Sequence, residues 1–305
     1  QVNFSCEASV GGGIPILMPL HQSLAANQIE SIVGILNGTT NYILSQMTET
    51  GVNYANALAD AQKQGFAEAD PTNDVCGFDA ARKLAILSSI GFRANVTFDD
   101  VLVEGIEKID KSDIQYAKDM GYTIKLLTVA LRQENGIALN VYPAFLPDNH
   151  PLSSVKGAYN AIYVTGNIVD DVMFYGRGAG ALPTASAVMG DVISTAQHIL
   201  NGSTGTGMIM TDTKRIPFYS SLKLQNSYYF RLDVDDVTGV LSQIAAAFAE
   251  NDISICEVVQ KRKTKGLAEL VLITELASRE SILQVEKGLQ VLPCMRKVAN
   301  VIRVM

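Results

Sequence analysis

Hydrophobic and polar positions follow two periods along residues 1 to about 200. Apolar side chains that recur every three to four positions predict helices, whereas β-branched runs between Gly, Pro and Asn predict strands. We expect helices at 15–26, 39–50, 53–64, 74–90, 112–120 and 183–200. We expect strands at 2–10, 29–36, 122–131, 136–146, 160–168 and 171–176. This part is therefore predicted to be α+β, with a mixed, mostly antiparallel sheet and helices on one face.

The remaining residues form a polar stretch and a second periodic unit. Residues 201–225 are rich in Gly, Ser and Thr and show little periodicity, which is typical of a linker. Residues 226–305 then read strand, helix, strand, strand, helix, strand, the ferredoxin-like βαββαβ order. We expect a first domain at 1–208, a linker at 209–225 and a small second domain at 226–305.

Composition narrows the class of protein. With 305 residues and 48% hydrophobic content the chain can bury a large core, and its length suits about two domains. A net charge of −7 without any long basic run argues against nucleic acid as a partner. No apolar run reaches the roughly 18 to 20 residues of a membrane span.

The cysteines and histidines suggest no metal or disulfide framework. The four cysteines are scattered and form no CxxC pair, so we expect reduced thiols in a cytoplasmic protein. The three histidines lack zinc-ligand spacing. The chain begins at Gln1, without Met or a signal-peptide pattern, and we expect it to be a fragment of a longer protein.

A concentration of charge stands in GFAEADPTNDVCGFDAARK, residues 65–83. Asp79 and Lys83 are four residues apart and share one helix face. They could form an exposed ion pair contributing only ~0.2–0.5 kcal/mol. However, Lys83 also shares its face with Ile86 and Leu87, so we expect it to be partly desolvated. Such an ammonium can exchange a proton with a substrate oxygen.

Three further acids precede that predicted helix. Asp74 lies near its start and could cap it, since carboxylates are favoured there. Glu68 and Asp70 project from a loop that Pro71 stiffens. This cluster suits an ammonium or hydroxyl group of a ligand, with a divalent metal as the alternative.

The segment GILNGTTNYIL, residues 34–44, reads as a strand entering a helix. Asn37 or Thr39 can cap the helix, whose free N–H groups can receive a carboxylate. A capped helix that binds nothing is equally compatible with the pattern. Together, donors for a carboxylate, acids for an amine and a lysine for an oxygen outline an amino-acid substrate.

Two glycine-rich stretches complete the candidates. CEASVGGGIPIL, residues 6–17, could hold a monovalent cation through carbonyls and Glu7, although a tight turn also explains its glycines. GRGAGALPTASAVMGD, residues 176–191, would let a flat or phosphorylated ligand approach the backbone. Taken alone, this glycine pattern is a weak signal.

Together these motifs resemble the homoserine dehydrogenase family. Five of them recur in the family's order over residues 1 to about 200: EASVGGGIPI, GILNGTTNYIL, GFAEADPTNDVCGFDAARK, the segment from 103 to 127, and GRGAGALPTASAV. The resemblance implies interconversion of L-homoserine and L-aspartate 4-semialdehyde with NAD or NADP, mainly in the reducing direction. It also implies that the family's N-terminal Rossmann domain is missing from this chain.

The resemblance assigns roles to individual residues. It implies Lys83 as the catalytic lysine and Gly180 as a contact of the nicotinamide nucleotide. The implied substrate-binding residues are Glu68, Asp79, Gly38, Thr39, Phe66 and Asp74. Phe66 is often Tyr in the family, which puts a contact through a phenol in doubt. The implied sodium ligands are Glu7, Val10, Gly12 and Ile14, the last three through carbonyls.

Residues 226–305 resemble an ACT domain. The usual D-x-P-G-V-L motif appears within DDVTGVL, residues 235–241, with Thr238 in place of proline. The resemblance implies feedback inhibition by L-threonine and a homodimer or homotetramer, with a ligand-free dimerisation module as the alternative. The implied effector residues are Asp235, Gly239, Asn251 and Ile253. For the whole chain, the other hypothesis is a non-catalytic amino-acid-sensing and dimerisation protein.

Overall fold

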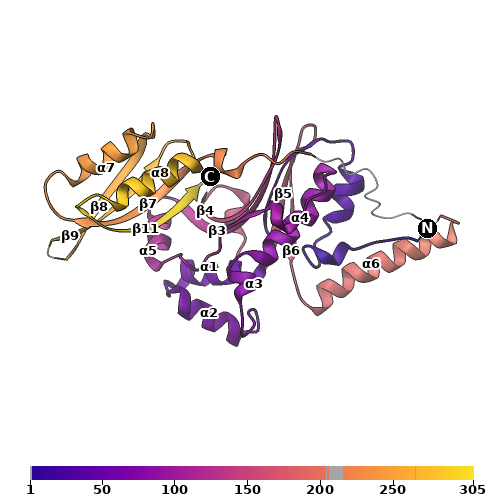
Figure 1. Ribbon diagram of the computed structural model, residues 1–305. Helices are drawn as coiled ribbons and strands as arrows, with labels where there is room; N and C mark the ends of the chain where they lie inside the picture. Colours follow the sequence, from indigo (N-terminus) through magenta and orange to yellow (C-terminus); the bar gives the residue numbers. More distant parts are fainter. Residues whose placement is uncertain (1, 204, 206–215, 265) are drawn as a thin grey trace.

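The computed structural model describes residues 2–203, 205, 216–264 and 266–305 (Figure 1). Its helices are α1 Gly38–Thr50, α2 Tyr54–Lys63, α3 Thr72–Val75, α4 Phe78–Phe92, α5 Lys111–Asp119, α6 Ala181–Leu200, α7 Val240–Ala249 and α8 Arg279–Gln290. Its strands are β1 Ile29–Ile35, β2 Leu102–Val103, β3 Tyr122–Gln133, β4 Gly136–Pro147, β5 Tyr159–Gly166, β6 Asp170–Arg177, β7 Gln225–Asp235, β8 Ile255–Thr264, β9 Leu267–Thr274, β10 Ala277–Ser278 and β11 Met295–Val304. The fold class is α+β, as predicted.

One sheet runs through both parts of the chain. Its strand order is β6-β5-β1-β3-β4-β11-β7-β9-β8, with β2 beside β4 and β10 beside β7. The pairs are antiparallel except for β2–β4 and β11–β4. The β11–β4 pair consists of Arg303 opposite Ala144 and Val304 opposite Phe145. The C-terminal βαββαβ unit therefore continues the N-terminal sheet instead of standing apart from it.

Strand β3 shows how the sheet is buried. Its residues Leu126 and Ala130 pack into the core beneath α1, α4 and α5, while Leu127 and Val129 pack on the opposite face. On that face the short helix at 151–154 contributes Leu152 to the cluster. Because both faces are covered, β3 and β4 read as nearly continuous apolar runs and not as alternating ones. A separate core lies under α7 and α8 of the C-terminal unit.

The prediction of a single helix over 74–90 is wrong in one respect, because this segment forms parts of two helices, α3 and α4. Gly77 has φ of +83°, a left-handed conformation that ends α3 and starts α4 in a new direction. The prediction that Asp74 caps this helix is wrong as well, since the N-cap of α4 is Gly77 and no side chain caps it. Asp74 instead lies in α3, where its carboxylate can face another element.

Two further expectations near the N-terminus fail. The strand expected at 2–10 is replaced by a 3₁₀ turn at Glu7–Ser9. The helix expected over 15–26 is reduced chiefly to a π-helical turn, Pro19–Ser23. Of the predicted linker, 209–215 lies outside the described residues, while Ser221–Lys223 forms a 3₁₀ turn.

Candidate active site

The ion pair predicted from the sequence lies at the start of α4. Lys83 Nζ is 2.7 Å from Asp79 Oδ2 and also donates to the carbonyl oxygen of Leu36, at 3.1 Å. The Lys83 side chain is 21% exposed, so its ammonium is shielded but still accessible. Because Leu36 follows β1 directly, the ammonium points toward the β1–α1 connection. Its third N–H remains available to a ligand oxygen.

Asn37 joins this pair to Asp74. Its Nδ2 donates to Asp79 Oδ2 at 2.9 Å and to Asp74 Oδ1 at 2.7 Å. Its Oδ1 accepts from the backbone N–H of Thr40, so Asn37 is also the N-cap of α1. One amide thus uses its acceptor to start a helix and its two donors to hold two carboxylates. The sequence suggested the cap, but it did not reveal the second role.

The loop before α3 closes over the start of α1. Thr39 Oγ1 donates to the carbonyl of Phe66 at 2.5 Å, and the Phe66 ring packs on Tyr42 with centroids 4.6 Å apart. Phe66 is nevertheless 42% exposed. The loop therefore presents an aromatic ring at its surface beside the N-terminus of α1.

The acids of this loop differ in their availability. Asp70 Oδ1 accepts from the hydroxyl and the N–H of Thr72, bonds that lower the pKa of Asp70 below its usual value. In contrast, the exposed Glu68 carboxylate hydrogen-bonds to none of the residues that the structure describes, although the Glu68 carbonyl accepts from Gln62. Glu68 is thus the loop acid free to meet a ligand, but it is not held against Lys83.

A buried asparagine that the sequence did not identify lies between the start of α1 and the glycine turn before α6. Asn160 in β5 is 1% exposed, and its Oδ1 has no hydrogen-bond partner among the described residues. A Cβ atom on Gly38 would lie 2.9 Å from the carbonyl of Ala158, and one on Gly178 would overlap the Asn160 amide. Glycine is required at both positions for this close approach, which brings the starts of α1 and α6 together.

The two glycine-rich stretches lie against each other. The N–H of Gly13 donates to the carbonyl of Arg177 at 3.1 Å. Gly12 has φ of +54°, and a Cβ there would overlap the Gly178 carbonyl. Gly180, with φ of +120°, is the N-cap of α6 and provides no capping side chain. No side chain caps the first N–H groups of this 20-residue helix, so a negatively charged or flat group of a ligand can approach them.

The predicted sodium ligands surround the same turn. The buried Glu7 carboxylate accepts from the N–H groups of Ile16, Leu17 and Met18, at 2.5, 2.8 and 2.8 Å. These amides already stabilise its negative charge, so a cation would depend on the loop carbonyls as well. Within the described ranges no cluster of three or more His, Cys, Asp or Glu side chains could hold a metal. The sodium site stays a prediction.

The predicted effector residues are mostly engaged within the C-terminal unit. Asp235 pairs with Arg296 through two contacts of 2.6 and 2.9 Å. Asn251 donates to the carbonyl of Ala247 at the end of α7, and Ile253 lies in the core. Gly239, with φ of +90°, begins α7 without a side-chain cap. None of these contacts joins one of the four residues to another, and their role as effector residues stays a prediction.

Comparisons with known proteins agree on the class that the fold and site define, an oxidoreductase of amino-acid biosynthesis with a C-terminal ACT domain. The homoserine dehydrogenase family profile matches residues 15–193, and the ACT domain profile matches residues 228–294. The homoserine dehydrogenase of Corynebacterium glutamicum is 41% identical over 308 residues, covering 99% of this chain and 68% of that protein. That of Bacillus subtilis is 40% identical over 301 residues, covering 98% and 69%.

Solved structures agree with these relatives. The homoserine dehydrogenase from Thiobacillus denitrificans superposes with a TM-score of 0.93 at 37% identity, covering 98% of this chain and 69% of that one. The enzyme from S. aureus gives 0.68 at 31% identity, covering 91% and 65%. The chain belongs to the homoserine dehydrogenase family, whose members use NAD or NADP. Over the part of the chain that the structure describes, no helix has the length and apolarity to cross a membrane.

Proposed function

We propose that these residues form the substrate site for the NAD(P)-dependent interconversion of L-homoserine and L-aspartate 4-semialdehyde, with Lys83 as the acid–base group. The observation that carries the proposal is the 2.7 Å contact of Lys83 with Asp79, beside the Leu36 carbonyl and the Asn37 amide. Two oxygens orient the ammonium and leave one N–H for the substrate oxygen. Asp79 is the acidic partner that holds the lysine side chain in this position.

The proposed proton transfer takes place at the oxygen on the reacting carbon. A nicotinamide nucleotide, when bound, would supply the hydride that reduces the aldehyde carbon. In that direction the Lys83 ammonium donates a proton to the aldehyde oxygen to give the hydroxyl of homoserine. In the oxidising direction the lysine amine takes the hydroxyl proton. Asn37 holds Asp79 in place throughout and keeps the lysine aimed at the β1–α1 connection.

The other end of the substrate carries the carboxylate and the ammonium of an amino acid, and each of these charges needs a binding group. We assign its carboxylate to the N-terminus of α1 at Gly38 and Thr39, and its ammonium to Glu68 and Asp79, with Asp74 holding Asn37. Phe66 covers this end by its ring alone. The free Glu68 carboxylate and the exposed loop support this assignment.

For the nucleotide we assign Gly180, because the uncapped start of α6 lets a flat ring approach the backbone. This assignment concerns the nicotinamide end of the nucleotide. For sodium we assign Glu7 with the carbonyls of Val10, Gly12 and Ile14, a ligand set of hard oxygens. We retain the domain limits 1–208, 209–225 and 226–305, which enclose the two matched profiles.

The activity is tested with Lys83→Ala in the full-length enzyme. Following NADPH oxidation with aspartate semialdehyde, we expect kcat to fall about 10²- to 10⁴-fold, the usual contribution of a positioned acid–base group. Lys63→Ala, an exposed lysine on α2, is the matched control and should retain activity. A Lys83→Ala enzyme that is folded and turns over at the wild-type rate would contradict the proposal.

We further propose that L-threonine binds the ACT domain near Gly239 and Asp235 and inhibits the enzyme, which acts as a homodimer or homotetramer. The match to the ACT profile and the uncapped α7 start support this. Adding L-threonine to the same assay should lower the rate, and Asp235→Asn should weaken the inhibition. A rate insensitive to threonine would remove the feedback proposal and leave the catalytic one intact.

A further inference from the structure

A cavity of about 530 Å³ lies between the ACT domain and the loop that precedes α5. Residues 103–109 form one wall, and α8 with residues 298–301 of β11 form the other. This position is separate from the α7 start and from the Asp79–Lys83 pair. Its volume falls within the range of small-ligand sites, about 300–1,000 Å³.

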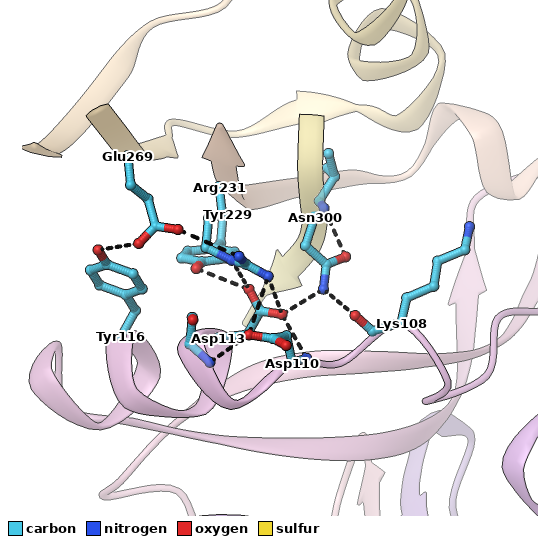
Figure 2. Close-up of polar contacts among 10 residues, drawn as sticks. Lys108, Asp110, Asp113, Tyr116, Tyr229, Arg231, Glu269 and Asn300 are labelled. Atoms are coloured by element: carbon cyan, nitrogen blue, oxygen red, sulfur yellow. Dashed lines mark hydrogen bonds and ion pairs between the residues drawn. The ribbon is translucent and has the colours of Figure 1, made fainter. Parts of the chain in front are cut away.

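Charges of both signs face this cavity. Arg279 and Glu286 of α8 are paired at 2.6 Å, and Glu104 lies 4.0 Å from Arg279. Glu107 and Lys108, both exposed, come from the same wall as Glu104, opposite α8. The Lys108 ammonium has no hydrogen-bond or ion-pair partner in the described part of the chain, and Figure 2 shows it directed away from the neighbouring polar network.

The floor of the cavity is rigidly built. Asn300, 8% exposed, donates to the carbonyl of Lys108 at 2.9 Å and to Asp113 Oδ2 at 2.8 Å (Figure 2). Asp113 is fully buried and also receives two bonds from Arg231. On the other side, Arg303 holds Glu104 through two 3.0 Å contacts. The cavity is therefore preformed, which reduces the entropy lost when a ligand binds.

We propose that this cavity binds a small zwitterion, of the class of a free amino acid, as a second regulatory site beyond the α7 start. A carboxylate would meet Lys108 and Arg279, and an ammonium would meet Glu107 and Glu286. A ligand of single charge would contact only one of these two sets of groups. A zwitterion pairs with both.

The loop that lines the cavity also contacts the segment that carries Asp74. The N–H of Ile106 donates to the carbonyl of Val75 at 2.8 Å, and a Cβ on Gly105 would overlap that carbonyl. The Cys76 thiol donates to Glu107 at 3.1 Å. A ligand that moves Glu107 therefore displaces α3.

From α3 the displacement reaches the site in two hydrogen bonds. Asp74 accepts from the Asn37 amide, and that amide also donates to Asp79, the partner of Lys83. Occupancy of the cavity thus changes how firmly Asp79 is held. The expected consequence is a change in turnover without any contact between ligand and substrate.

The test uses calorimetric titration of the protein with L-amino acids supplied one at a time, together with the activity assay. We expect at least one to bind, and Lys108→Gln to weaken its binding about 10- to 100-fold, as for a lost charge-assisted hydrogen bond. Lys287→Gln, an exposed lysine on α8 outside the cavity, is the matched control and should bind normally. Asp235→Asn, at the end of β7 and outside the cavity, should also leave this binding unchanged.

Three results would overturn the inference. They are no binding by any amino acid, binding weakened by Asp235→Asn but not by Lys108→Gln, and binding that leaves hydrogen exchange of 72–77 and 103–109 unchanged. Lys108→Gln should keep its basal rate, since Lys108 contacts neither substrate nor cofactor. Loss of binding with a normal rate therefore separates this site from the proposed catalytic one.

Discussion

Replacing Asp113 by alanine should strongly destabilise the protein, because this carboxylate joins α5 to the ACT domain. Asp113 has no exposed surface, and it accepts bonds from Arg231 Nε and Nη2 at 2.7 and 3.2 Å. It also accepts from Tyr229 at 3.1 Å and Asn300 at 2.8 Å. Figure 2 shows these donors, from β7 and β11, converging on one side chain of α5.

The expected magnitude follows from what alanine leaves behind. Removing one partner of a buried ion pair typically costs about 3–5 kcal/mol, because the remaining charge stays buried without compensation. Arg231 would keep only weaker contacts, to Glu269 at 3.5 Å and Asp110 at 3.8 Å. These compensate in part, so we expect Asp113→Ala to lower the free energy of unfolding by about 3 kcal/mol.

Asp113→Asn separates charge from shape. Asparagine keeps the volume and one acceptor oxygen, so its loss should be smaller, about 1.5–3 kcal/mol for hydrogen bonds to charged groups. The matched control is Glu49→Gln, which breaks the exposed pair with Lys156 (side chains 45% and 69% exposed) and should cost below about 1 kcal/mol.

Urea unfolding followed by far-UV circular dichroism measures all three variants against the wild type. The order of losses should be Asp113→Ala, then Asp113→Asn, then Glu49→Gln. A loss for Asp113→Ala no larger than that for Glu49→Gln would refute the reasoning, because it would mean that the buried network contributes no more than a surface pair.

Three other predictions follow from single residues. Burial lowers the pKa of Lys125 from 10.5 to about 8, so the unfolded chain binds this proton more tightly than the folded protein does. Between pH 8 and 10.5 the free energy of unfolding of the wild type should therefore rise by about 3 kcal/mol relative to that of Lys125→Met, and an equal pH dependence of the two in urea unfolding would contradict this. Gly77→Ala places a Cβ at φ of +83° and 3.1 Å from two valine methyl groups, and should lower the melting temperature through a loss of about 1–2 kcal/mol; an unchanged melting temperature would argue against the helix break. Burial and the hydrogen bond to Glu107 raise the pKa of Cys76 to about 11, so Glu107→Gln should speed alkylation of this thiol by iodoacetamide, and an unchanged rate would show that the contact is absent.

Local patterns in the sequence predicted most elements correctly. The i, i+4 contact of Asp79 with Lys83 and the N-cap at Asn37 are short-range features that residue spacing alone reveals. The break at Gly77 was missed because a single glycine within a helical pattern is usually tolerated. Here it adopts a left-handed conformation beneath Val103 and Val141, a tertiary cause that no local window contains.

Long-range polar contacts were beyond prediction for a similar reason. Asn37 and Asp79 are 42 residues apart, and Asp113 and Arg231 are 118 apart. Each side chain taken alone is compatible with a solvated surface, and only the packing of α3, α5 and β7 decides otherwise. Within the single sheet, the C-terminal strands pair with the N-terminal strands through two residue pairs at the end of β11. Two pairs are too few to leave a pattern in the sequence.

The pairing of β11 with β4 limits how the ACT domain can influence catalysis. Because β11 pairs with β4 and the Asp113 network is buried, a large rotation of the ACT domain would break many contacts at once. A ligand can shift an equilibrium only by its difference in affinity for the two states, typically 1–3 kcal/mol of coupling. A coupling energy of this size can drive only a small displacement, such as a shift of the loop at 103–109. This loop contacts α3, which carries Asp74. We therefore expect regulation to appear as a graded change in the alignment of Lys83, with the two parts of the sheet remaining joined.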